Sequence, residues 1–131
     1  MLHHLSLGVR DIARTANFYD AALAPLGYDR VWSDIRSGEP DQAIGYGPPG
    51  GGDKLALKQH GDAAAPGSGF HIAFAAPNRQ AVDAFHKAAL AAGGRDNGPP
   101  GLRRDYGPTY YAAFVIDPDG HRLEAVFKGP A

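Results

Sequence analysis

The chain has 131 residues and a formal net charge of −1, which suits one compact domain and gives no electrostatic reason to expect nucleic acid as a partner. It contains no cysteine, so disulfides and thiolate chemistry are excluded. The amino terminus lacks the basic region and apolar run of a signal peptide, and no apolar stretch approaches the ~20 residues that span a bilayer. We therefore expect a soluble, cytoplasmic protein that does not associate with membranes.

Residues 1–60 are predicted to form a β-α-β-β-β module. The first strand, residues 4–9, alternates between an apolar face and a face that begins with His4. Asp11 is placed to cap a helix that carries one apolar stripe as far as about residue 26, where Gly27 supplies a stop. Three further strands are expected at residues 28–32, 42–46 and 55–58.

Residues 69–131 are predicted to repeat this order after a linker at 61–68. The expected elements are a strand at 70–75, a helix at 79–92 after the cap residue Asn78, and a hairpin whose strands cover 110–116 and 121–127. Phe70 is assigned to the core face of its strand. Residues 96–108 hold three prolines and three glycines and are interpreted as a mobile loop, with room for one short strand.

A repeat supports the two-module interpretation. Residues 4–27 align without a gap on residues 71–94, and the informative identities pair His4 with His71, Phe18 with Phe85, Leu23 with Leu90 and Gly27 with Gly94. The offset of 67 residues indicates a duplicated strand-helix unit. We predict one α+β domain over 1–131, with two modules forming a curved, cup-shaped mixed sheet and helices on the outside.

Three side chains of the types that bind metals fall on the non-core faces of separate predicted strands. They are His4, His71 and Glu124. If the sheets curve so that these faces converge, the three make a two-histidine, one-carboxylate site with open coordination positions, suited to divalent Fe, Mn, Ni, Co or Zn. Such a site can act as a Lewis acid, and Glu124 can serve as the catalytic base if it detaches from the metal. Polar side chains lining a wet cavity are the structural alternative.

Three motifs resemble the vicinal oxygen chelate superfamily, which includes glyoxalase I, extradiol dioxygenases and the bleomycin and fosfomycin resistance proteins. They are the opening His-Leu-Ser-Leu-Gly-Val-Arg-Asp, the central Gly-Phe-His-Ile-Ala-Phe, and Tyr-Tyr-Ala-Ala-Phe-Val-Ile-Asp-Pro-Asp-Gly-His-Arg-Leu-Glu near the end. The resemblance implies two paired modules around a divalent metal, ligands at His4, His71 and Glu124, a small-molecule substrate chelated by vicinal oxygens, and a homodimer.

One position departs from the glyoxalase pattern. Such proteins carry a fourth ligand on the last strand of the first module, and the offset of 67 maps Glu124 onto Leu57, which cannot bind a metal. The three-ligand set resembles extradiol dioxygenases, whereas the chain length favours glyoxalase-like lyase or isomerase chemistry. Both reaction classes stay open. A metal-free binding or antibiotic resistance protein of the same fold is the alternative function.

Several other residues are candidates for binding substrate. Tyr106, Tyr110 and Tyr111 each offer a phenol, and of these Tyr106 and Tyr111 are the predicted substrate-binding residues, together with Arg104. Four other polar side chains are weaker candidates. His60 and His121 are reserve candidates for acid-base roles, Arg103 is a second loop arginine, and Arg122 is placed to pair with a carboxylate or to close the cup.

Overall fold

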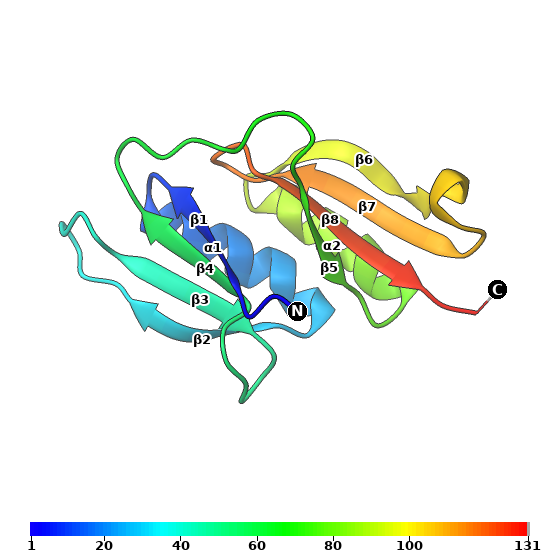
Figure 1. Ribbon diagram of the computed structural model, residues 1–131, viewed down its shortest axis with the longest axis horizontal. Helices are drawn as coiled ribbons and strands as arrows, with labels where there is room; N and C mark the ends of the chain where they lie inside the picture. The colour runs from blue at the N-terminus through cyan, green and yellow to red at the C-terminus, as the bar shows by residue number, and fades with distance from the viewer. Residues whose placement is uncertain (131) are drawn as a thin grey trace.

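The computed structural model describes residues 1–130, which form two four-stranded sheets, each covered by one long helix (Figure 1). The first half contains β1 (Leu5–Val9), α1 (Ile12–Leu23), η1 (Ala24–Leu26), β2 (Asp29–Asp34), β3 (Ala43–Gly47) and β4 (Leu55–Gln59). The second half contains β5 (Ile72–Ala75), α2 (Arg79–Ala91), β6 (Arg95–Leu102), η2 (Arg104–Tyr106), β7 (Tyr110–Ile116) and β8 (Arg122–Lys128).

The two halves have the same topology. The strand orders are β1-β4-β3-β2 and β5-β8-β7-β6, and in each sheet the first and last strands of the module pair in parallel while the others pair antiparallel. The period of 67 holds at the starts of the first strand and the helix of each module: Leu5 and Ile72, and Ile12 and Arg79. The predicted α+β class with two β-α-β-β-β modules is confirmed. We call residues 1–60 module one and residues 69–130 module two.

Both helices lie on the same side of the two sheets and pack against each other (Figure 1). Their starts follow the predicted chemistry, because the Asp11 side chain accepts from the Ala13 and Arg14 amides and the Asn78 side chain accepts from the Ala81 amide. Gly27 has φ 87°, a left-handed conformation that glycine adopts at little cost. The apolar faces of helices and sheets form the core, and the opposite face of each sheet, here called the open face, carries no helix.

A buried polar network joins the modules through the turn between β7 and β8. The Tyr19 hydroxyl on α1 donates to Asp117 Oδ2 at 2.5 Å, and Asp117 Oδ1 accepts from the Asp119 and His121 amides. Burial raises the pKa of Asp117, and burial followed by the Asp117 charge raises the pKa of Tyr19. His121 is 2% exposed, and its Nε2 donates to the Gly8 carbonyl at 2.7 Å. This reserve acid-base candidate therefore has a structural contact across the module boundary.

Two local predictions need correction. Most of the predicted loop at 96–108 is strand β6, whose prolines cannot donate to a ladder and are tolerated because β6 is the outer strand of its sheet. Its register with β7 shifts at Asp96/Gly98 and at Gly98/Gly101. Phe70 lies before β5 and is 37% exposed, so it is not a core residue. Within residues 1–130, neither helix has the length and hydrophobicity needed to cross a membrane.

Candidate functional site

A histidine, a glutamate and a tyrosine meet on the open face of module two. The Glu124 carboxylate on β8 lies with its Oε1 2.8 Å from His71 Nε2, and its Oε2 accepts a hydrogen bond from the Tyr110 hydroxyl at 2.5 Å. The strand register explains this meeting: Ala73 of β5 pairs with Glu124, and Phe114 of β7 pairs with Glu124 from the other side. His71 and Tyr110 are an even number of residues from those partners, so they share the face of Glu124.

Glu124, His71 and Tyr110 differ in their exposure to solvent and in their charge. The Glu124 side chain is 2% exposed, whereas the His71 side chain is 48% exposed, so His71 borders solvent above the buried carboxylate. Burial, followed by the hydrogen bond to Glu124, raises the pKa of Tyr110 to about 12. The phenol therefore stays protonated at neutral pH and donates to the carboxylate.

His4 does not join this pair within the chain. It lies just before β1, is exposed, and has its Nδ1 2.8 Å from His3 Nδ1. Among residues 1–130, no three His, Asp or Glu side chains lie close enough together to hold a metal ion. The structure thus brings together two of the three predicted ligands.

The donor atoms of His71 and Glu124 are spaced for a shared ion. Two ligand atoms about 2.1 Å from one metal, at an angle near 90°, are about 3 Å apart. The observed 2.8 Å between His71 Nε2 and Glu124 Oε1 is within a few tenths of an ångström of that value. Tyr110, bonded to the other oxygen, has the position of an outer-shell group that orients a ligating carboxylate. Imidazole nitrogen and carboxylate oxygen are donor types that fit a divalent metal, and within the chain the same 2.8 Å separation is a hydrogen bond between them.

The parallel pairing corrects the counterpart of Glu124 in module one. Leu5 pairs with Leu55 in the first sheet, whereas Ile72 pairs with Leu123 in the second, so β8 is offset by one residue more than β5. Glu124 therefore corresponds to Ala56, and Leu57 belongs to the core face, where it is fully buried. Alanine has no donor atom, so the absence of a fourth ligand at this position holds after the correction.

The open face of module two is hollowed beside His71. This hollow, which we call the His71 pocket, has a volume of about 290 Å³. It is lined by Ser68, Gly69, Phe70, His71, Asn97, Tyr106, Phe114 and Arg122. Tyr106 is 64% exposed at the end of η2, and its ring centroid lies 5.2 Å from that of Tyr110. The predicted substrate-binding Tyr106 is therefore next to the His71–Glu124 pair.

Tyr111 and Arg104, the other predicted substrate-binding residues, lie elsewhere. The Tyr111 hydroxyl donates to Asp83 on α2 at 2.6 Å, which places its side chain on the helix-covered face. Arg104 is exposed in η2 and lines a groove next to the His71 pocket. Their roles stay predictions. Tyr110 could have been preferred to Tyr111 from the sequence alone, because alternation along the predicted hairpin puts Tyr110 on the face of Glu124.

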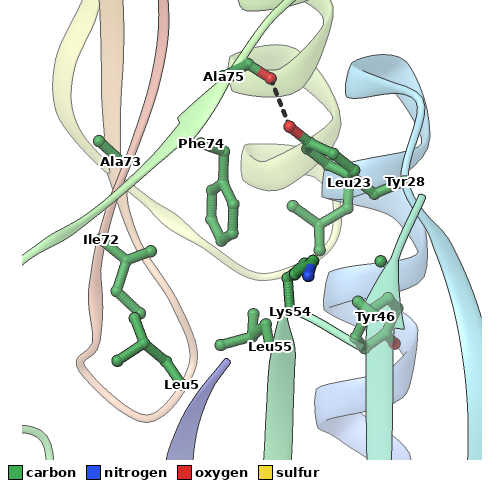
Figure 2. A pocket seen from close by; sticks show the side chains of 11 residues that line it. Leu5, Leu23, Tyr28, Tyr46, Lys54, Leu55, Ile72, Ala73, Phe74 and Ala75 are labelled. Atoms are coloured by element: carbon green, nitrogen blue, oxygen red, sulfur yellow. Dashed lines mark hydrogen bonds between the residues drawn. The ribbon is translucent and has the colours of Figure 1, made fainter. Parts of the chain in front are cut away.

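A second pocket of about 240 Å³ lies between the modules, at the facing edges of β1 and β5. Figure 2 shows its mainly apolar wall, with Leu5 and Leu55 opposite Ile72 and Phe74. The Tyr28 hydroxyl donates to the Ala75 carbonyl at 2.9 Å and connects the modules at its rim. None of the predicted site residues lines this pocket.

Comparisons with known proteins agree on one family. The family model described as Glyoxalase/Bleomycin resistance protein/Dioxygenase superfamily matches residues 1–125. A glyoxalase/bleomycin resistance protein from Albidiferax ferrireducens T118 is 32% identical, with 96% of this chain and 97% of that chain covered and a TM-score of 0.76. A glyoxalase-related enzyme from Fulvimarina pelagi is 25% identical, with 97% and 87% covered and a TM-score of 0.71.

A more distant similarity concerns the fold alone. A glyoxalase I mutant from Zea mays is 21% identical and has a TM-score of 0.70, with 94% of this chain but 45% of that chain covered. No curated protein matches the sequence.

Proposed function

Because this chain belongs to the glyoxalase/bleomycin resistance protein/dioxygenase superfamily, we propose that it is a metal-dependent enzyme acting on a small molecule that carries vicinal oxygens. The observation that carries the proposal is the 2.8 Å approach of His71 Nε2 to Glu124 Oε1, with Tyr110 bonded to the second carboxylate oxygen. The reaction classes are a lyase or isomerase reaction and ring-cleaving dioxygenation.

His71 and Glu124 would hold the metal in this proposal. When bound, a divalent ion supplies a Lewis acid that stabilises negative charge developing on substrate oxygens. The chain's own residues orient and protect the site. Tyr110 fixes the Glu124 carboxylate through Oε2, and the low exposure of Glu124 limits its access to water. With Oε2 held by Tyr110, the Oε1 oxygen of Glu124 would be the one available to accept a proton from a bound substrate.

His4 is the third ligand of the proposal and comes from a second copy of the chain. Two features support this. His4 is exposed and stands apart from His71 and Glu124 within one chain. The helices α1 and α2 pack on each other, which leaves the open faces of both sheets available to a partner. A homodimer in which module one of each copy faces module two of the other would complete two identical sites.

Metal analysis of protein prepared without a tag or chelator tests the proposal. We expect close to one divalent ion per chain in the wild type, and at least tenfold less in His71→Ala and in Glu124→Gln. His60→Ala is the matched control, because His60 is exposed and lies outside the site, and it should keep the wild-type content. Iron would favour dioxygenation, and nickel or zinc a lyase or isomerase. No metal, with no uptake of added Fe, Mn, Ni or Zn, would overturn the proposal.

Mixing two defective variants tests the origin of His4. In a mixed dimer of His4→Ala and His71→Ala, one site has both defects and the other has an intact His4 and an intact His71. Random exchange of subunits should therefore restore about a quarter of the wild-type metal content. If His4 acted within its own chain, every site would carry one defect and no metal would return. Each variant alone is the baseline.

One observation favours a second candidate function. Both oxygens of Glu124 already accept hydrogen bonds in the chain, so the carboxylate is satisfied without a metal. A metal-free protein that binds a small molecule in the His71 pocket would show this arrangement. Binding of a ligand that is unaffected by a chelator, in protein that takes up no metal, would favour it over the enzyme.

A further inference from the structure

The His71 pocket carries a cation without a partner in the chain. Arg122 lines the pocket, is exposed, and forms no ion pair with a carboxylate among residues 1–130. The lining contains no Asp or Glu, and the nearby Glu124 is occupied by His71 and Tyr110. A guanidinium has five N–H donors in a planar fork that matches a carboxylate. Arg122 is therefore available to an anionic group that enters from solvent.

A second arginine, Arg103, does not line the pocket but adds positive potential beside it, through its position over the lining residue Phe114. The Arg103 guanidinium carbon lies 5.4 Å from the ring centroid of Phe114, and Arg103 Nη2 donates to the Pro99 carbonyl at 2.5 Å. These contacts hold the Arg103 side chain against β6 without neutralising it, since no carboxylate within residues 1–130 forms an ion pair with it. Fixed charges of one sign along a pocket attract the opposite charge.

The remaining wall is aromatic. Phe70, Tyr106 and Phe114 line the pocket, and the His71 ring centroid lies 6.2 Å from that of Phe114. Flat apolar surfaces of this kind bind rings by stacked or edge-to-face contact. The volume of about 290 Å³ is at the small end of ligand sites, which suits one ring with a short side chain.

The strand spacing sets the length of the ligand. Arg122 precedes Glu124 by two residues on the same face of β8, so the two positions are about 6.6 Å apart along the strand. One molecule can therefore reach Arg122 with its anionic end and the His71–Glu124 pair with its other end. An aromatic ring between the two ends would lie against Phe114.

We propose that the His71 pocket binds an aromatic carboxylate, with Arg122 as the residue that selects the carboxylate and with Phe70, Tyr106 and Phe114 as the walls that hold the ring. The inference rests on the proposed function only for what happens at the His71–Glu124 end. The selection of the anion depends on Arg122 and does not need a metal.

A titration with two matched probes tests the inference. Phenylacetate and phenylacetamide have nearly the same shape, and only phenylacetate is charged. Each is added to chelator-treated, full-length protein while backbone amide NMR signals are followed. In the wild type we expect phenylacetate to bind about tenfold more tightly, equivalent to about 1.4 kcal/mol, with shifts at Gly69, Phe70, Asn97 and Tyr106. Arg122→Gln should reduce the ratio to below about threefold.

Arg79→Gln is the control variant. Arg79 is also an exposed arginine of module two but lies at the start of α2 against Tyr111, on the helix-covered face and outside the His71 pocket, so the preference for the carboxylate should survive its replacement. Equal affinity for the two probes, binding of neither, or a preference that persists in Arg122→Gln would overturn the inference. Because the titration is done without metal, a failure of the metal proposal leaves its result unchanged, and the metal analysis above does not depend on the probes.

Discussion

The two modules have one backbone plan and very different open faces. In module two the face carries His71, Glu124 and Tyr110 beside an aromatic pocket. In module one the position of Glu124 is Ala56, its neighbour on β3 is Gly45, and the Trp32 indole covers that glycine so closely that an added Cβ would lie 2.3 Å from Nε1. A duplicated fold thus keeps its topology while only module two carries the buried carboxylate and its hydrogen-bond partners, and module one has small residues under a tryptophan at the corresponding place.

The largest effect is expected from giving module one the missing carboxylate. Ala56 is 2% exposed, so Ala56→Glu would bury a charge without the donors that Glu124 receives from His71 and Tyr110. We expect the free energy of unfolding in urea to fall by about 3 kcal/mol. Ala56→Gln is the control of similar size without the charge. Equal losses of unfolding free energy in the two variants would show that the loss comes from crowding under Trp32 and not from the buried charge.

The stability provided by the hydrogen bond between Tyr19 and Asp117, which joins the modules, should depend on pH. Tyr19→Phe removes the hydroxyl that donates to buried Asp117, and we expect a loss of about 2 kcal/mol in unfolding free energy near pH 7. The pKa of Asp117 is already raised by burial, so its contribution to stability is present at low pH and is lost as pH rises through the folded pKa. Without the Tyr19 hydroxyl the pKa of Asp117 rises further, so Asp117 is protonated at pH 4 in both proteins. The loss of unfolding free energy in Tyr19→Phe should therefore be smaller near pH 4 than near pH 7. An equal loss of unfolding free energy at pH 4 and pH 7 would contradict this prediction.

Tyr110 and Tyr111 are adjacent residues on opposite faces of β7, and they allow a sharp comparison. Tyr110→Phe should weaken metal binding by roughly 10- to 100-fold, because it frees Glu124 Oε2. Tyr111→Phe, which removes only the bond to Asp83 on the helix-covered face, should change it by less than about twofold. Both are measured by competition with a metal indicator. A larger effect of Tyr111 would restore it as a site residue.

The smallest effect concerns the tryptophan that covers module one. Gly45→Ala should displace the Trp32 indole, at a cost of about 1 kcal/mol. Trp32 is the only tryptophan, so its fluorescence emission reports the change directly and should shift to the red as the ring becomes more exposed. Gly52→Ala is the control, because an added Cβ there meets no atom within 4 Å. An unshifted emission spectrum would mean that Trp32 adapts in place.

The sequence alone predicts the order of the helices and strands, and it predicts the part of the proposed site that lies on the closing hairpin. Alternation and the turn residues at 117–120 predicted the closing hairpin, and Tyr110–Ile116 is the strand observed. The same alternation placed Glu124 on the open face. Residues 96–108 were misjudged because proline and glycine usually mark loops, whereas an outer strand needs hydrogen bonds on only one side.

The strand register and the arrangement of the two modules could not be predicted from the sequence. The offset between the modules is 67 residues at β1 and β5 but 68 at β4 and β8, so a constant period of 67 maps Glu124 onto Leu57, one residue past its counterpart Ala56 and on the opposite face of the strand. Whether His4 reaches His71 depends on how two modules pack through helices that are far apart in sequence. Local patterning carries no information on that contact.

The outer strands restrict how copies of this chain can associate. At one end of the structure β6 contains Pro99 and Pro100, which offer no amide hydrogen to a neighbouring strand. At the other end β2 has a break in its ladder between Arg30 and Trp32 and charged residues at both of its ends. Neither outer edge is a good template for adding a strand, so growth of the sheets into fibres is disfavoured and closed assemblies are favoured.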